Sequence, residues 1–473
     1  MRRETVIGLE VHVQLATRSK MFCACSTAFG APPNTQVCPV CLGLPGALPV
    51  PNAMAVRLGV RAALALGCAV HPRSEFARKN YFYPDLPKGY QITQFDRPLA
   101  TGGRLALETA DRGTAEVGIA RLHLEEDAGK LLHDRIPGKT AVDLNRAGVP
   151  LAEIVTAPDL RSPAEARAWL TALRQLLIYA GVSDCSMEQG SLRVDANVSL
   201  RAVGDPAFGT RTEIKNLNSF ANVERALRAE TDRQQALLEA GRPVEHASLL
   251  FDAAAGAVRQ MRSKEESHDY RYFPDPDLPP LVVSSVERRE IEAELPELPA
   301  PKRLRLSSAY GLSAYEADVL AAERPVADFF EAVVAEGADP KSAAGWVMGL
   351  GLAGYHELGA FPDPSWLAQL ITLVAEGALS LQAARRVSAE PGDGGEPPRS
   401  IAMRLGLLQV RDDDALGRWA DEVIAAHPGE VARYRKGETR LLGFLVGQIM
   451  KRSLGAADPK RVQPLLKQKL EER

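Results

Sequence analysis

Residues 5–13 read Thr-Val-Ile-Gly-Leu-Glu-Val-His-Val, so apolar side chains alternate with Glu10 and His12. Alternation with a period of two predicts a β-strand that has one buried face and one polar face. Residues 192–200, Leu-Arg-Val-Asp-Ala-Asn-Val-Ser-Leu, alternate in the same way. The two stretches predict strands of a sheet that packs on one side only.

Helical patterns interrupt these strands. Apolar residues recur at helical spacing in three segments: 53–66, 163–179 and 222–240. Ser162 and Pro163 are the expected N-cap and first position of the second segment, and Gly241 is the expected stop of the third. Helices and strands mixed in this way predict an α+β fold for residues 1–294.

Two proline-rich stretches divide the rest of the chain. Residues 295–301 read Leu-Pro-Glu-Leu-Pro-Ala-Pro, a stiff connector, and residues 390–398 contain three glycines and three prolines, a flexible linker. Between them Ala and Leu recur at helical spacing. We therefore expect three domains, with boundaries at 1–294 (mixed α and β), 295–399 (helical, with the linker) and 400–473 (a small helical tail).

The composition is ordinary for a globular protein. The chain has 473 residues, of which 45% are hydrophobic and 25% charged, and its net charge is −3. No apolar run approaches the roughly 18 residues that a membrane span needs, and the N-terminus enters a strand pattern without a signal-peptide core. We expect a cytoplasmic protein with no membrane contact, in which any polyanion must meet a local basic patch.

Four of the six cysteines form one group, Cys23-x-Cys25 and Cys38-x-x-Cys41. In a cytosolic chain this spacing favours a metal over disulfides. Four thiolates satisfy tetrahedral Zn²⁺ and leave no open position. The group therefore predicts a structural zinc site rather than a catalytic one, and four unrelated buried thiols are the alternative.

Glu10 and His12 project from one face of the first predicted strand because they lie two positions apart. In residues 121–130, Arg-Leu-His-Leu-Glu-Glu-Asp-Ala-Gly-Lys, His123 and Glu125 share a face for the same reason. Like charges at a strand end repel unless a cation compensates them, and Mg²⁺ prefers oxygen ligands. These stretches predict a Mg²⁺ site suited to a nucleotide enzyme, and a solvated acidic strand end is the alternative.

Further polar side chains alternate on two strands: Arg193, Asp195 and Asn197 on one, and Glu213 and Lys215 on the other. Cross-strand neighbours of this kind would form a charged floor. Acids, bases and an amide together can position a phosphate and a reacting acyl group. A polar sheet face that merely meets water is the alternative.

The loop 78–91 combines cations with aromatic residues between prolines. Tyr81 could stack on a base while Lys79 or Lys88 meets a phosphate. A packed loop with a basic rim is the alternative. The sequence has no Gly-x-x-x-x-Gly-Lys-Ser/Thr motif, so any phosphoryl transfer does not use a P-loop.

The last part of the chain is locally basic. Residues 441–450 are mostly apolar and predict a buried helix directly before two bases. Contact with a nucleic-acid backbone is plausible for such a domain, and a solvated helical face is the alternative. The bases that we expect to meet a polyanion are Arg433, Arg435, Lys436, Arg440, Lys451 and Arg452.

Taken in order, several of these stretches resemble one family, the B subunits of the aspartyl/glutamyl-tRNA amidotransferase. The resemblance extends over nearly the whole chain, in the segments 4–15, 78–94, 121–130, 142–146, 190–200, 213–219, 269–274 and 443–451. It implies a cradle domain similar to the catalytic domain of glutamine synthetase, followed by a helical domain and a tail domain that contacts tRNA. Many members of this family lack the four cysteines, so zinc is not required by the chemistry that the resemblance implies.

The resemblance implies a reaction in two steps. ATP phosphorylates the side-chain carboxylate of Glu or Asp misacylated onto tRNA(Gln) or tRNA(Asn), and ammonia then displaces phosphate to give Gln-tRNA or Asn-tRNA. A separate amidase (A) subunit would supply the ammonia from glutamine, and a small C subunit would complete the assembly. A non-discriminating aminoacyl-tRNA synthetase is a further candidate partner.

The resemblance also suggests roles for the candidate residues. Glu10, His12 and Glu125 would bind Mg²⁺, with Glu213 as a weaker fourth candidate. The residues expected to position ATP, phosphate or acyl groups are Lys79, Tyr81, Lys88, Arg193, Asp195, Asn197 and Lys215.

Two other classes of function fit part of the sequence. One is a tRNA-binding scaffold without catalysis, in which the zinc loop and the tail are the working parts. The other is a free-standing amide ligase of the glutamine synthetase type, acting on a small molecule. The basic tail disfavours the second class.

Overall fold

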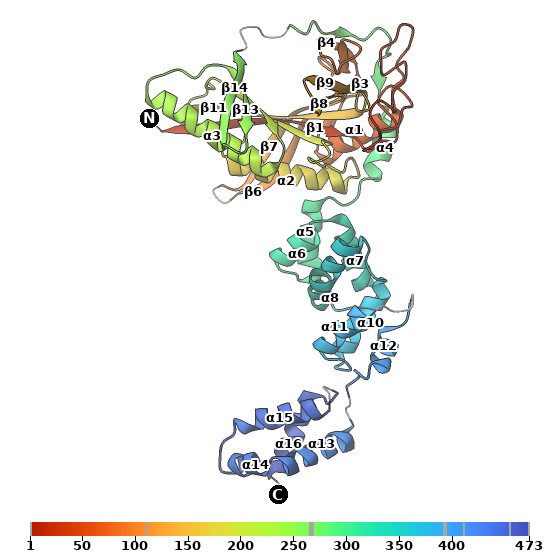
Figure 1. Ribbon diagram of the computed structural model, residues 1–473, viewed down its shortest axis with the longest axis vertical. Coiled ribbons are helices and arrows are strands. Elements are labelled where there is room, and N and C mark those ends of the chain that lie inside the picture. The colour runs from red at the N-terminus through yellow and green to blue at the C-terminus, as the bar shows by residue number, and fades with distance from the viewer. Residues whose placement is uncertain are drawn as a thin grey trace. The chain divides into compact units, whose positions relative to one another are not determined.

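The computed structural model describes residues 2–109, 112–263, 269–390, 395–409, 412–453 and 456–471. The chain divides into two compact units, residues 1–299 and 300–473 (Figure 1). Within the described ranges, no helix combines the length and apolarity that a membrane crossing requires.

Strands dominate the first unit. Their bounds are β1 (Arg3–Gln14), β2 (Ala69–Val70), β3 (Arg73–Ser74), β4 (Ala77–Asn80), β5 (Tyr90–Thr93), β6 (Ala100–Thr109), β7 (Gly113–Glu126), β8 (Lys130–Ile136), β9 (Lys139–Asp143), β10 (Pro150–Thr156), β11 (Leu192–Ala202), β12 (Thr212–Leu217), β13 (Ala247–Asp252), β14 (Ala257–Ser263), β15 (Phe273–Pro274) and β16 (Leu281–Val282). The helices of this unit are α1 (Ala53–Ala65), α2 (Pro163–Tyr179), α3 (Phe220–Glu239) and α4 (Ser285–Ala293).

The main sheet has the strand order β14-β13-β12-β11-β1-β10-β7-β6-β2 over the described residues. Its neighbouring strands are antiparallel except for the pair β12 and β13. Strand β1 lies in the middle, between β10 and β11, so its side chains reach both halves of the sheet. A smaller sheet, in the order β15-β4-β5, carries the loop after Asn80.

One face of the sheet is covered by helices and the other holds the polar residues. Ile7, Leu9, Val11 and Val13 of β1 are almost completely buried in the main hydrophobic cluster. Helices α2 and α3 pack on this side, against β6 and β11 respectively (Figure 1). Because side chains alternate along a strand, the even-numbered residues of β1 lie on the opposite face.

The local sequence predicts most of the helix bounds in this unit. Helix α2 begins at Pro163 behind Ser162, whose side chain accepts a hydrogen bond from the backbone N–H of Glu165. Helix α3 begins at Phe220, two residues before the expected start, because Ser219 caps it. Serine is a favoured N-cap, so the capping residue and not the apolar spacing marks this start.

The second unit is helical throughout its described residues. Its elements are α5 (Pro299–Tyr310), α6 (Ala314–Leu320), α7 (Arg324–Ala335), α8 (Pro340–Trp346), the π-helical turn η1 (Val347–Gly351), α9 (Leu352–Leu358), α10 (Pro364–Ala375), α11 (Leu381–Ala389), α12 (Pro398–Arg404), α13 (Asp413–Ala426), α14 (Pro428–Arg435), α15 (Leu441–Arg452) and α16 (Pro459–Glu471). It contains two separate hydrophobic clusters, one from α5 to α12 and one from α13 to α16.

The bounds of this unit differ in two places from the sequence pattern. Pro299 opens α5, so the connector predicted at 295–301 ends earlier, because proline suits the first turn of a helix. Helix α12 packs against α10 and α11, and its Ile401 and Ala402 belong to the first cluster although they follow residue 400. In the predicted linker 390–398, residues 391–394 lie outside the described part of the chain.

Candidate active site

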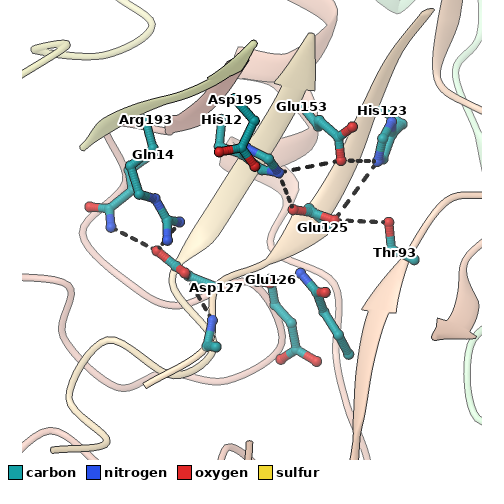
Figure 2. Close-up of polar contacts among 12 residues, drawn as sticks. His12, Gln14, Thr93, His123, Glu125, Glu126, Asp127, Glu153, Arg193 and Asp195 are labelled. Carbon is teal, nitrogen blue, oxygen red and sulfur yellow. Dashed lines mark hydrogen bonds and ion pairs between the residues drawn. The ribbon is translucent and has the colours of Figure 1, made fainter. Parts of the chain in front are cut away.

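Strand pairing brings two histidines and two glutamates together on the polar face of the main sheet. In the register of β1, β10 and β7, His12 lies opposite Glu153, and Glu153 lies opposite His123. Glu125 follows two positions after His123 and therefore projects from the same face. Figure 2 shows the four side chains converging on one point.

The distances within this group, which we call the carboxylate–histidine cluster (His12, His123, Glu125 and Glu153), are short. His12 Nε2 lies 3.4 Å from Glu153 Oε2 and 3.6 Å from Glu125 Oε1. His123 Nε2 lies 3.2 Å from Glu153 Oε2 and 3.8 Å from Glu125 Oε2. Both glutamates and His123 are buried, so water screens these charges only weakly.

The pKa values within the cluster show how strongly its members interact. Burial alone would lower the pKa of His123, but the carboxylates of Glu125 and Glu153 outweigh it and raise that pKa to about 9. Burial also acts to lower the pKa of His12, but Glu153 and Glu125 outweigh it and raise that pKa. Although burial acts to raise the pKa of Glu153, its bonds to the two histidines lower it. The two histidines therefore stabilise the buried charge of Glu153.

The donor set suits a divalent cation. One ligand atom from each of His12, Glu125 and Glu153 lies within 4.8 Å of the others. Carboxylate oxygens are the ligands that Mg²⁺ prefers, and an imidazole nitrogen is a common addition for softer divalent ions. Thr93 supports the arrangement, since its hydroxyl donates to Glu125 Oε2 over 3.1 Å.

Glu153 was not among the candidate residues predicted from the sequence, and His123 was placed on the same strand face as Glu125 without a ligand role. Strand β10 reads Pro-Leu-Ala-Glu-Ile-Val-Thr, in which Glu153 is the single charged residue. A lone carboxylate in an apolar strand is a signal in itself, because a buried charge needs a partner. Which partner it finds depends on strand pairing, and local sequence patterns do not reveal that pairing.

Two predicted Mg²⁺ ligands have other contacts in the structure. Glu10 Oε1 accepts a hydrogen bond from Asn197 Nδ2 over 3.0 Å, and Glu213 Oε1 lies 2.9 Å from Lys215 Nζ. Lys215 Nζ also donates to Asp195 Oδ2 over 2.9 Å. These residues form the predicted charged floor beside the cluster. Burial, followed by repulsion from the nearby Glu153, raises the pKa of Glu10.

Arg193 is held by a buried carboxylate that was not predicted from the sequence. Its Nη2 lies 2.8 Å from Asp127 Oδ2, and the amide of Gln14 donates to the same oxygen over 3.0 Å (Figure 2). Arg193 stands directly opposite His12 in the register of β1 and β11. Its guanidinium is therefore oriented at the edge of the cluster.

The three residues selected from the loop 78–91 occupy two different surroundings. Lys79 Nζ lies 4.8 Å from the ring centroid of Tyr270 and 5.9 Å from that of Tyr81. Although burial acts to lower it, the pKa of Lys79 is raised, first by the charge of Glu125 and then by Tyr272 and Tyr270. Lys88 instead pairs with the buried carboxylate of Glu126.

The four cysteines form a second group in the same unit that could hold a metal ion. One sulfur from each of Cys23, Cys25, Cys38 and Cys41 lies within 4.8 Å of the others, and none is in a disulfide. The backbone N–H of Cys38 donates to Cys41 Sγ over 3.2 Å, and the sulfurs of Cys38 and Cys41 lie 3.9 Å apart. The bond from Cys23 is the main cause that lowers the pKa of Cys41, to about 4.

The six bases selected in the tail are all exposed. Arg433 forms two hydrogen bonds with Glu438, Arg452 pairs with Glu422, and Arg435 Nε donates to the carbonyl of Leu470. The tail helix α15 forms as predicted, but it is not fully buried, because Phe444 keeps 42% of its surface exposed.

Comparisons with known proteins agree over nearly the whole length. The family described as the GatB/GatE catalytic domain matches residues 5–288, and that described as the GatB domain matches residues 328–470. The B subunit of the aspartyl/glutamyl-tRNA(Asn/Gln) amidotransferase of Moorella thermoacetica is 52% identical over 99% of this chain and 100% of its own length. The protein of the same name from Geotalea daltonii is 50% identical over the full length of both chains.

Proposed function

Because this chain belongs to the family of B subunits of the aspartyl/glutamyl-tRNA(Asn/Gln) amidotransferase, we propose that it catalyses the ATP-dependent transamidation of misacylated tRNA. The substrates are Glu-tRNA(Gln), Asp-tRNA(Asn) or both, and the products are Gln-tRNA(Gln) and Asn-tRNA(Asn). The observation that carries this proposal is the carboxylate–histidine cluster on the polar face of the sheet.

The reaction proceeds in two steps. A carboxylate oxygen of the acyl side chain attacks the γ-phosphorus of ATP, and the bond to the β-phosphate oxygen breaks to release ADP. Ammonia then attacks the carbonyl carbon of this side-chain acyl phosphate, loses a proton, and expels inorganic phosphate. Neither step needs a covalent bond to the protein, so the chain contributes orientation and charge.

His12, Glu125 and Glu153 would hold Mg²⁺. Glu10, which interacts with the charges of Glu153 and Glu213, and Glu213 itself would be weaker candidates. The ion would supply neutralisation of phosphate charge. Lys79, Tyr81, Lys88 and Arg193 would bind ATP or the acyl phosphate, and Asp195, Asn197 and Lys215 would orient the reacting groups. The support for this assignment is that Lys79 on β4 interacts with the charge of Glu125, that Arg193 on β11 stands opposite His12, and that Lys215 on β12 pairs with Asp195. Tyr81 lies beside Lys79, whereas Lys88 pairs with Glu126 and has the weaker support.

The cysteine group would hold a structural Zn²⁺, since four thiolates leave no position for a substrate. The first unit would form a cradle of the glutamine synthetase type, the helices up to α12 a helical domain, and the helices α13 to α16 a tail domain that meets tRNA. Support for the last assignment comes from Lys436, Arg440 and Lys451, which are exposed and make no ion pair among the residues described.

An amidase (A) subunit and a small C subunit would complete a cytoplasmic heterotrimer, and the amidase would deliver the ammonia. Neither a Gly-x-Ser-x-Gly elbow nor another amidase serine motif occurs in this sequence. The non-discriminating aminoacyl-tRNA synthetase remains a further candidate partner, since it would supply the misacylated tRNA.

Reconstitution with the A and C subunits tests the proposal against a tRNA-binding scaffold. Glu125→Ala should abolish formation of Gln-tRNA and Asn-tRNA while tRNA affinity stays within twofold of wild type. A scaffold role predicts full product yield from this variant. Assaying both misacylated tRNAs also identifies the substrate.

The tail assignment has its own experiment. The triple variant Lys436→Glu, Arg440→Glu and Lys451→Glu should raise KM for tRNA roughly tenfold or more at low salt and leave kcat nearly unchanged. The double variant Arg385→Glu and Arg386→Glu, exposed bases of α11, is the control for net charge. Equal KM values in the two variants would contradict the assignment, and would favour a ligase that acts on a small molecule.

A further inference from the structure

Lys20 is a fully buried lysine next to the four cysteines. Its exposed fraction is 0%, although lysine is almost never completely buried without a partner. Its Nζ donates to the carbonyl of Gln36 over 2.7 Å, lies 3.4 Å from the carbonyl of Leu144, and lies 3.6 Å from Cys41 Sγ. An ammonium group in this place requires an explanation.

No carboxylate of the described residues neutralises the charge of Lys20. Over the part of the chain that the structure describes, Lys20 takes part in no ion pair with Asp or Glu. Lys302, the other lysine that is buried among these residues, is neutralised by ion pairs. Its Nζ lies 3.1 Å from Asp328 and 2.9 Å from Glu331. Two carbonyl dipoles and one sulfur surround Lys20 instead, and only the sulfur can carry a full negative charge.

We propose that Lys20 is the buried counter-charge of the four-cysteine centre and a determinant of its zinc affinity. The inference rests on the structural zinc assigned above. Four thiolates and one Zn²⁺ sum to two negative charges, and a buried charge is costly unless another compensates it. The ammonium beside Cys41 removes half of that excess and hydrogen-bonds to the ligand sulfur, as groups in contact with metal ligands commonly do.

The same side chain joins the cysteine loop to the segment that precedes β10, the strand that carries Glu153. Lys20 reaches Leu144 across the loop, and Asn145 accepts a hydrogen bond from the backbone N–H of Gln36 over 2.8 Å. The backbone of Met21 donates to Gly148. Residues 144–148 lead directly into β10, so Lys20 ties the zinc centre to a segment beside the active site.

Zinc affinity of the full chain tests the inference directly. Competition with a chromophoric chelator should show binding weakened about 10–100-fold in Lys20→Met and in Lys20→Gln. Glutamine can still donate to the carbonyl of Gln36, so that variant removes the charge with the least change in packing and serves if the methionine variant fails to fold. Lys302→Met, which removes the other buried lysine, should bind zinc within twofold of wild type.

The melting temperature of the zinc-free chain separates this role from simple packing. A packing role predicts that Lys20→Gln lowers this melting temperature while zinc affinity stays within twofold of wild type, and that result would overturn the inference. A wild-type chain that binds no zinc would overturn both the zinc site and the role of Lys20. Wild-type binding together with unchanged affinity in Lys20→Gln would overturn the role of Lys20 alone.

Discussion

The two metal-ligand groups of the first unit are built in opposite ways. The four cysteines come from a single loop of 19 residues, 23–41, and four sulfurs leave no ligand position open. The carboxylate–histidine cluster draws on strands β1, β7 and β10, and its three candidate ligands would leave positions for water or phosphate. The cysteine group can be recognised from the spacing of residues along the sequence, because its members are close together in the chain. The carboxylate–histidine cluster cannot, because the pairing of distant strands brings its members together.

The largest expected effect is a loss of transamidation activity when the carboxylate–histidine cluster, rather than the cysteine group, is changed. Glu125→Gln keeps the size of the side chain but removes a ligand charge, so kcat for transamidation in the reconstituted enzyme should fall about a thousandfold. Glu116→Gln is the matched control, because Glu116 is on the same strand β7 but exposed, paired with Arg104. A Glu125→Gln enzyme with more than a tenth of wild-type kcat would remove the cluster from the reaction.

The second prediction is that the carboxylate–histidine cluster and the cysteine group bind different metal ions. Glu153→Gln should weaken binding of Mn²⁺, a spectroscopic substitute for Mg²⁺, on the order of a hundredfold in an electron paramagnetic resonance titration. Its zinc content should stay at about one equivalent. If Mn²⁺ affinity is unchanged, Glu153 contributes no ligand and the predicted set with Glu10 and Glu213 becomes the better one.

The third prediction concerns the cysteine group. Cys41→Ser should remove the bound zinc and lower the melting temperature of the first unit by roughly 5 °C, since a structural site stabilises mainly the fold. The kcat at low temperature should fall much less than in Glu125→Gln. Cys68→Ala, a change in the core away from the loop, should keep its zinc. Loss of kcat in Cys41→Ser as large as in Glu125→Gln would erase the distinction between the two groups.

The smallest expected effect is a dependence of stability on pH. The folded pKa of His123 is about 9, above its ordinary value of 6.5, so its charge stabilises the fold below about pH 6.5 and this contribution is lost as pH rises through 9. The melting-temperature advantage of wild type over His123→Gln should therefore shrink between pH 6.5 and 9 without Mg²⁺. A difference that stays constant with pH would show that the cluster does not hold a proton on His123. His133→Gln, at an exposed histidine, is the control.

The sequence predicts the helices and strands of this fold better than it predicts which strands lie beside one another. Alternation in residues 5–13 identifies the face of β1 that bears Glu10 and His12, and Ser162 marks the start of α2. Pairing of β1 with β10 involves residues more than a hundred positions apart, and nothing in either strand specifies the register. For that reason the sequence predicts His12 and Glu125 as ligands but not Glu153, which stands between His12 and His123.

Crystals of the full chain soaked in MnCl₂ provide the most direct measurement of the central claim, that the cluster binds a divalent ion distinct from the zinc. An anomalous difference map should show manganese bound by His12, Glu125 and Glu153, and a separate zinc peak among the four cysteines. A manganese peak held by Glu10 and Glu213 without Glu153, or no peak on this face of the sheet, would contradict the account.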